Sequence, residues 1–248
     1  DQTLTMTKID NYSSQVGGRL VNYLPAWQSI TTNRFVLQSV QGHVLQFAQK
    51  PPMFRDPSRF EMQVPHYQVP TIDSEVTKLA EKGAIEPADK GAGFFSKLFV
   101  VPKSDGGSRP VFNLKPLNRF INKPRFKMPT LAQIKQAILP GDWAITLDLT
   151  DAYLHVPIHR RHRRFLRFVW RKKPWQFRAL PFGLTSAPRT FTLLTKPLIN
   201  LCRARGIQIF LYLDNALILY RSRAEALEAK RYVMSLLKRL GFQLNLKK

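Results

Sequence analysis

The sequence has a single cysteine, no long apolar run and no secretion signal. Cys202 cannot form a disulfide within the chain, and no apolar stretch reaches the roughly 20 residues that cross a bilayer. The opening DQTLTMTKID has neither the basic nor the apolar segment of a signal peptide, and it does not begin with Met. We therefore expect a piece of a longer intracellular protein with no membrane partner, and leave the choice between cytoplasm and nucleus open.

Acidic residues are also scarce, because 16 Asp and Glu stand against 39 Lys and Arg and give a formal net charge of +23. The positive charge is spread along the chain and is accompanied by 11% aromatic residues. A polyanion is the expected partner, and nucleic acid is favoured over an anionic membrane. The hydrophobic content of 44% is enough for a sizeable core, which excludes a disordered tail.

Hydrophobic periodicity predicts helices and antiparallel strands from residue 67 onwards. Helices are expected over 72–82, 130–138, 186–205 and 222–240, with glycines 83, 206 and 241 at or near their ends. Hairpins are expected over 93–113, 163–180 and 207–220, with single strands at 143–149 and 242–246. Residues 1–66 are mixed and are interpreted as an N-terminal extension or linker. The predicted fold class is α+β, with helices backing an antiparallel sheet.

Two aspartates occupy strand ends. Asp148 ends the apolar strand WAITLDL, and Asp214 lies where IQIFL turns back into ALILY, with Asp214 and Asn215 expected at the hairpin tip. Adjacent strand ends can bring two carboxylates together, which is how a two-metal site for phosphoryl transfer is assembled. From the spacing alone, solvated strand ends or turn formers are the favoured interpretation of both aspartates.

Five segments in order resemble the fingers and palm motifs of reverse transcriptases. They are FVVPKSDGGSRPVFNLKPLN, TLDLTDAYLHVPI, LPFGLTSAPRTF, YLDN and LGFQLNLKK. The resemblance implies right-hand polymerase fingers and palm over residues 67–248, acting as an RNA-directed DNA polymerase of a retroelement polyprotein. The form LPFGL resembles elements with long terminal repeats, and VGGRLVNYLPAWQSIT followed by PP resembles DIRS-type retrotransposons, which integrate with a tyrosine recombinase.

The resemblance also implies roles for individual residues. The metal ligands would be Asp148, the backbone carbonyl of Leu149, and Asp214, binding two Mg²⁺ or Mn²⁺ ions. The residues implied around the incoming nucleotide are Lys103, Arg109, Asp151, Ala152, Tyr153, Phe182, Gly183 and either Lys247 or Lys248. Tyr153 would act as the steric gate that selects deoxynucleotides. A buried aromatic for Tyr153, and ordinary solvated charges for Lys103 and the terminal lysines, stay open as alternatives.

The implied partners are an RNA template, a DNA or RNA primer and dNTPs. The thumb and ribonuclease H domains of the family are absent from this chain, and they and a tyrosine recombinase are expected elsewhere in the same polyprotein.

One motif departs from the family pattern, because Tyr212-Leu213-Asp214-Asn215 stands where the family has Tyr-x-Asp-Asp. Asn215 keeps an oxygen acceptor but lacks the negative charge, so the catalytic position is degenerate. This predicts an impaired polymerase. The alternative is a catalytically silent nucleic-acid-binding descendant, or a structural subunit of a larger polymerase.

The segment 155–170 combines arginines, histidines and aromatic residues. Arginines expected on a template-binding surface are Arg160, Arg161, Arg163, Arg164 and Arg167, since alternation points the aromatics inward and the arginines outward. His155, His159 and His162 have the spacing of a zinc site on a helix, but Pro157 interrupts that helix and the neighbours are basic. We therefore interpret the histidines as part of the basic surface.

Overall fold

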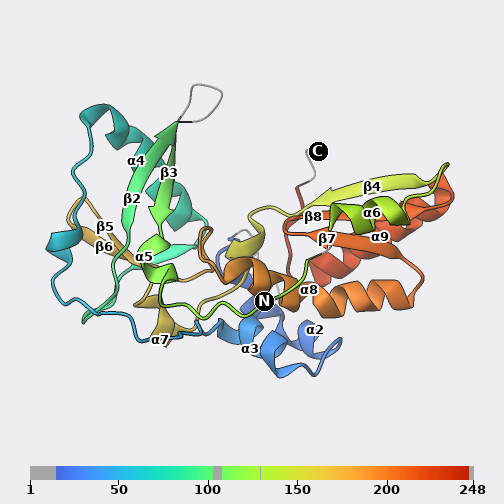
Figure 1. The fold of residues 1–248 in the computed structure, drawn as a ribbon, viewed down its shortest axis with the longest axis horizontal. Coiled ribbons are helices and arrows are strands. Elements are labelled where there is room, and N and C mark those ends of the chain that lie inside the picture. Colours follow the sequence, from blue (N-terminus) through green and yellow to red (C-terminus); the bar gives the residue numbers. More distant parts are fainter. Residues whose placement is uncertain (1–14, 103–107, 129, 246–248) are drawn as a thin grey trace, which may run out of the picture.

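The computed structural model describes residues 15–102, 108–128 and 130–245, which form an elongated molecule with β-structure at both ends (Figure 1). One end holds a three-stranded sheet of order β4-β8-β7. The other end holds a three-stranded sheet of order β1-β6-β5 and the two-stranded sheet β2-β3. All strand pairs are antiparallel. The mixture of helices and antiparallel sheets confirms the predicted α+β class.

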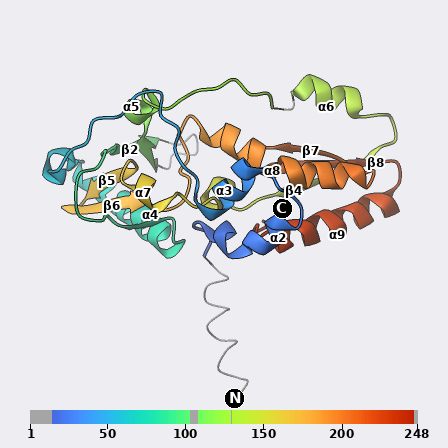
Figure 2. The same cartoon turned by 90° about the horizontal axis from the view of Figure 1, so that it is seen from below.

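The first sheet is backed by the two longest helices of the described residues. Its strands are β4 (Trp143–Asp148), β7 (Gln208–Tyr212) and β8 (Asn215–Tyr220). Helix α8 (Ala187–Ala204) packs on β7, and α9 (Arg223–Arg239) packs on β8 and β4 (Figure 2). The helices bury apolar side chains such as Phe191, Leu194 and Val233 against the strands, so this face of the sheet is closed to solvent.

The second end is built from the two other predicted hairpins and helix α4 (Val69–Glu81), all of which are confirmed. Its strands are β1 (Ile85–Pro87), β2 (Lys97–Pro102), β3 (Ser108–Asn113), β5 (Arg167–Trp170) and β6 (Lys173–Phe177). Phe112 of β3 packs edge to face against Phe168 of β5 and Phe177 of β6, at centroid distances of 4.9 and 4.7 Å. These aromatic contacts hold the two sheets of this end together.

Helix ends follow the expected signals. Gly83, at φ 66°, follows α4, and α6 (Leu131–Ala137) begins with a capping box between Thr130 and Gln133. Before α9, the Ser222 hydroxyl accepts the N–H of Glu225 and donates to the Glu225 carboxylate. The remaining short helices are η1 (Arg19–Tyr23), α2 (Leu24–Gln28), α3 (Arg34–Gly42), η2 (Pro57–Phe60), η3 (His66–Gln68), α5 (Lys115–Asn118), η4 (Ala152–His155) and α7 (Arg160–Arg163).

The N-terminal segment shares its core with the sheet of β4, β8 and β7. Trp27 of α2 is fully buried, and its indole N–H donates to the carbonyl of Leu240 at 2.9 Å. Leu20, Val36 and Val40 lie in the same continuous hydrophobic core. Residues 15–42 therefore pack on helix α8 and on the end of α9, which back this sheet, while the domain boundary at residue 66 stays a prediction.

Three local expectations were wrong. The β7–β8 turn is centred on Leu213 and Asp214, and Asn215 already belongs to β8, where it pairs with Tyr212. The segment 242–246 forms only an isolated bridge, Leu149 to Leu244, within its described part. His155 is fully buried rather than part of a basic surface. Cys202 is buried as predicted, and no helix among the described residues is long and apolar enough to cross a membrane.

Candidate active site

The end of β4 and the start of β8 bring the two predicted aspartates to one place on the sheet. Asp148 lies directly opposite Asn215 in the β4–β8 register. One step further, the backbone N–H of Leu149 donates to the carbonyl of Asp214 at 2.8 Å. Residues directly opposite in antiparallel strands have their Cβ atoms about 4.5–5.5 Å apart, so Asp148 and Asn215 are side-chain neighbours. The structure thus brings Asp148, Asp214 and Asn215 together at one edge of the sheet.

The turn that presents Asp214 is strained. Leu213 has φ 55°, a left-handed conformation that glycine or asparagine normally occupies. A non-glycine residue held there costs on the order of 1–3 kcal/mol and persists only where the surroundings fix it. Strain of this kind concentrates at functional sites, which supports a functional reading of this hairpin tip.

Each carboxylate accepts a hydrogen bond from an asparagine amide. Asn215 Nδ2 donates to Asp214 Oδ1 at 2.8 Å, and Asn245 Nδ2 donates to Asp148 Oδ2 at 3.0 Å. The backbone N–H of Asn245 also donates to the Asp148 carbonyl at 2.8 Å. Two anionic groups at neighbouring strand ends are thereby oriented by neutral donors.

The donor set at this edge fits a hard divalent cation. Mg²⁺ binds through one or two carboxylates together with substrate phosphates, and Asp148 and Asp214 supply that number. Among the described residues, no group of three or more His, Cys, Asp and Glu side chains is arranged to hold a metal. A site with two carboxylates agrees with that result, because Mg²⁺ needs no larger protein cluster when a substrate contributes ligands.

Tyr153 lies beneath this edge. Its side chain is 6% exposed, and its ring packs against Phe182 at 4.9 Å and against Phe191 at 5.5 Å. Burial, together with the charges of Asp214 and Tyr212, raises the pKa of Tyr153 to about 12. The phenol therefore keeps its proton at neutral pH. Phe182 is 55% exposed, and its ring packs on the buried ring of Tyr153.

The loop that carries Phe182 and Gly183 is fixed by a side chain that sequence reasoning missed. Asn118 Nδ2 donates to the carbonyl of Gly183 at 2.8 Å, and Asn118 Oδ1 accepts the N–H of Thr185 at 2.9 Å. Gly183 has φ 88°, which explains the glycine. Because 65 residues separate Asn118 from Gly183, only the fold reveals this clamp.

A cavity of about 380 Å³ opens beside the loop that carries Phe182 and Gly183. Its walls include Phe182, Gly183 and Asp151, together with Pro110 from β3 and Lys82 after α4. Lys82 forms an ion pair of 2.8 Å with the Asp151 carboxylate. Lys82 is a further residue that sequence reasoning did not select, and it places a cation beside Asp151, one of the predicted nucleotide residues.

Of the other predicted nucleotide-binding residues, the structure describes Ala152 and the backbone of Arg109. Ala152 is buried in η4 beside Tyr153, and Arg109 pairs with Val101 across the β2–β3 hairpin. Lys103, Lys247 and Lys248 lie outside the described residues.

The predicted arginine surface divides in two. Arg160, Arg161 and Arg164 are exposed, as expected. Arg167 is 3% exposed and donates to Gln176 Oε1 and to the Gly91 carbonyl, so its placement on a binding surface was wrong. The reason is that β5 is buried on both faces, which removes the alternation on which that prediction relied.

Arg163 is also largely engaged within the protein. It donates to Glu86 at 2.9 Å and to the carbonyl of Ile158 at 3.1 Å. Its role is structural in this arrangement, and the exposed arginines remain as candidates for phosphate contact.

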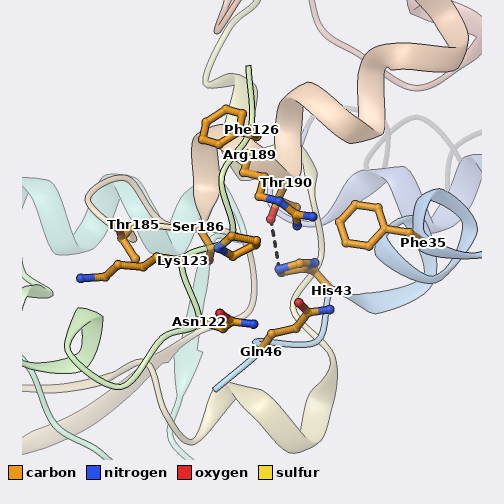
Figure 3. Close-up of a pocket in the computed structure, with 11 residues that line it drawn as sticks. Phe35, His43, Gln46, Asn122, Lys123, Phe126, Thr185, Ser186, Arg189 and Thr190 are labelled. Atoms are coloured by element: carbon orange, nitrogen blue, oxygen red, sulfur yellow. Dashed lines mark hydrogen bonds between the residues drawn. The ribbon is translucent and has the colours of Figure 1, made fainter. Parts of the chain in front are cut away.

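A second, smaller cavity of about 140 Å³ lies where α3 meets the start of α8 (Figure 3). His43 projects toward it and contacts the Thr190 hydroxyl at 3.3 Å (Figure 3). Burial, with the nearby His162 and Arg189, lowers the pKa of His43 to about 4. Lys123 and Arg189 line this cavity, but none of the predicted catalytic or nucleotide residues does.

The sequence of the chain matches the model of a known protein family. A family model described as reverse transcriptase (RNA-dependent DNA polymerase) matches residues 101–248. Two Schizosaccharomyces pombe proteins, the Transposon Tf2-3 and Tf2-4 polyproteins, are each 24% identical over 148 residues, covering 60% of this chain. The matched part spans only 11% of the length of these relatives.

The fold has solved counterparts. The prototype foamy virus protease-reverse transcriptase superimposes with a TM-score of 0.69 in a mutant form and 0.64 in the native form. Sequence identity is 21% in both cases, covering 84% and 85% of this chain and 27% and 26% of the viral chain. At this identity the likeness establishes the fold, and the α+β architecture of fingers and palm is confirmed.

Proposed function

The chain belongs to the reverse transcriptase family, and we propose that it is the fingers and palm of an RNA-directed DNA polymerase from a retrotransposon polyprotein. The observation that carries the proposal is the β4–β8 register, which sets Asp148 opposite Asn215 and beside Asp214. In the proposed reaction, the 3′-hydroxyl of a primer paired with an RNA template attacks the α-phosphate of a dNTP. A phosphodiester bond forms, the bond between the α- and β-phosphates breaks, and pyrophosphate leaves. The expected division at residues 1–66 and 67–248 belongs to the same proposal.

Asp148, the Leu149 carbonyl and Asp214 would hold two Mg²⁺ or Mn²⁺ ions. When bound, such ions activate the attacking hydroxyl and neutralise the charge of the leaving phosphate. The chain's own contribution is to orient the two carboxylates at a strained, fixed strand end and to exclude water beneath them with Tyr153 and Leu149, both buried.

We assign the incoming nucleotide to the cavity beside the loop of Phe182 and Gly183. Phe182 and Gly183 offer a ring and an exposed backbone to a base, and the Asn118 clamp keeps both in place. Tyr153 would face the sugar as the steric gate. Lys82 and Asp151, with Lys103, Arg109 and Lys247 or Lys248, would surround the phosphates.

The exposed Arg160, Arg161 and Arg164 would contact template phosphates, in keeping with the net charge of +23. The proposal of a DIRS-type origin rests on the resemblance of the segment VGGRLVNYLPAWQSIT. Thumb, ribonuclease H and tyrosine recombinase domains would then belong to the parent polyprotein.

In this proposal, Asn215 slows primer extension because it lacks the negative charge of the family's second aspartate. Unit charges 4 Å apart at an effective dielectric of 20 interact by about 4 kcal/mol, and a divalent ion doubles that gross value. Solvation cancels much of it, but a loss of about 3 kcal/mol from the transition state would slow the chemistry roughly 100-fold. The Asn215 amide also donates to Asp214, so it acts as an orienting group rather than a second anionic ligand.

A primer-extension assay tests the proposal. Wild-type chain and Asn215→Asp are compared on an RNA template with Mg²⁺, with Asp148→Ala as the blank. We expect the Asp variant to extend faster by up to about 100-fold, because it restores the missing charge.

The possible results separate the two parts of the argument. Equal rates for wild type and Asn215→Asp would show that the missing charge at position 215 does not slow the chemical step. The assignment as a polymerase would be unaffected. Extension by neither chain above the blank would contradict the enzyme assignment. A salt-dependent RNA titration would then distinguish a silent nucleic-acid binder from a structural subunit.

A further inference from the structure

Asn245 lies in the segment LGFQLNLKK, and it holds the Asp148 carboxylate through contacts to which the sequence analysis assigned no role. Its amide Nδ2 donates to Asp148 Oδ2 at 3.0 Å, and its backbone N–H donates to the Asp148 carbonyl at 2.8 Å. The two residues are 97 positions apart. We infer that Asn245 is a positioning residue that fixes the orientation of Asp148 for divalent-cation binding, an inference that rests on the proposed function.

The chemistry of an amide suits this task. The N–H group donates to an ionised carboxylate in a charge-assisted hydrogen bond, which is stronger than a bond between neutral groups. A lysine at this position would add a positive charge that repels a metal ion, and an aspartate would repel Asp148. Asparagine restrains the carboxylate without changing the charge of the site.

The segment that carries Asn245 is anchored on the palm by backbone contacts. Thr150 N–H donates to the Gln243 carbonyl at 3.0 Å, and Gln243 N–H donates to His155 Nε2 at 2.9 Å. Nε2 of His155 must therefore be unprotonated, which places the ring proton on Nδ1, 3.2 Å from the Ala152 carbonyl. The fully buried His155 thus connects η4 to the segment before Asn245.

The N-terminal segment anchors the other side. Trp27 donates to the Leu240 carbonyl and packs edge to face against Phe242 at 6.0 Å. Gly241 has φ 94°, and a Cβ there would lie 2.4 Å from the Tyr23 ring. Residues 19–27 lie outside the part matched by the family model, and their contacts with Leu240, Gly241 and Phe242 hold the segment that leads to Asn245.

The test uses the full 248-residue chain with Asn245→Leu, which removes the amide but keeps a similar volume, and Asn245→Ala, which removes both. Asn200→Leu is the matched control, because Asn200 is exposed on α8 away from the site. Mn²⁺ binding is measured by electron paramagnetic resonance without nucleic acid, and primer extension gives kcat and the KM for dNTP.

Both Asn245 variants should weaken Mn²⁺ binding and lower kcat by about 10-fold, the usual effect of losing a partner that orients a metal ligand. The KM for dNTP should stay within about twofold of wild type, because no dNTP contact is removed. The thermal midpoint should stay within about 2 °C of the Asn200→Leu control, since the backbone bond to Asp148 remains.

Several results would overturn the inference. Wild-type Mn²⁺ affinity and kcat in Asn245→Leu would show that the side chain only fills space. Losses in kcat that follow a fall in thermal midpoint would show a purely structural role. In both cases wild-type extension would still support the proposed function. A wild-type chain that neither extends primers nor binds Mn²⁺ would refute the proposed function and this inference together.

Discussion

Two hairpins of the described residues have two-residue turns, and neither uses glycine at its strained positions. In the β5–β6 turn, Arg171 and Lys172 have φ of 49° and 58°. In the β7–β8 turn, Leu213 has φ 55°, whereas Asp214 is not at positive φ. Turns of this kind match the twist of antiparallel strands, but they favour Gly or Asn where φ is positive.

The two turns differ in what their strain supports. Around the first, Asp73 of α4 accepts from Trp170 Nε1 and from Arg171 Nε, each at 2.8 Å, and Glu61 accepts the N–H of Lys172. Those partners come from distant parts of the chain, so the turn joins elements of the fold.

Around the second turn, the hydrogen bonds of Asp214 go to Asn215 and to Leu149 of the same sheet edge. Strain in the first hairpin is therefore offset by tertiary contacts that stabilise the fold. In the second hairpin it presents a carboxylate at the end of a sheet.

The largest expected difference concerns activity. Asp214→Ala removes one of the two proposed carboxylate ligands of the metal ions, and we expect primer extension to fall at least about 100-fold when measured in the faster Asn215→Asp chain. The thermal midpoint should change by no more than about 2 °C, because Asp214 is a turn residue whose backbone carbonyl still accepts from Leu149. If Asp214→Ala still extends primers, Asp214 is not a metal ligand and the second hairpin has no catalytic role.

The corresponding change in the first hairpin should affect stability instead. Asp73→Ala leaves the indole N–H of Trp170, a side chain only 5% exposed, without its acceptor. An unpaired buried donor costs about 1–3 kcal/mol of unfolding free energy, whereas the exposed ion pair with Arg171 contributes little. Urea denaturation measures the loss.

Asp73→Asn is the matched control, since its amide oxygen can still accept the indole N–H. We expect it to retain most of the stability, and both variants should extend primers at the wild-type rate. Equal destabilisation by Ala and Asn would show that the charge of Asp73, not its hydrogen bond, is the important feature.

Much of the fold was accessible from sequence because its signals are local. The Ser222 cap and Gly83 each act within a few residues and correctly predicted helix ends. The Thr130 capping box is equally local, but only the structure revealed it. The β7–β8 turn shows the limit of local rules. They favour asparagine at a strained turn position, but the chain places Leu213 there and leaves Asn215 in the strand.

The candidate site was only half accessible, for a physical reason. Asp148 and Asp214 were found because strand ends and motifs mark them, and the register then brought their strands together. Asn118 and Asn245 lie within two of the quoted motifs, but their roles were missed because an amide hydrogen bond across 65 or 97 residues leaves no periodic pattern in a sequence. Arg167 was misplaced because alternation cannot show that both faces of a strand are covered.

The smallest expected effect compares glycine at the two strained turns. Lys172→Gly should raise unfolding free energy by about 0.5 kcal/mol, because relief of the left-handed conformation slightly exceeds the entropy that glycine loses on folding. Lys172 is exposed, and its N–H can still donate to Glu61. Leu213→Gly should give no gain, because the partly buried Leu213 side chain packs on the core and its loss offsets the relief. Thermal denaturation of both variants checks this: a midpoint about 1–2 °C higher for Lys172→Gly alone is expected. Equal gains at both turns would show that the Leu213 contacts contribute nothing, and that the second hairpin is held by its strands rather than by its tip.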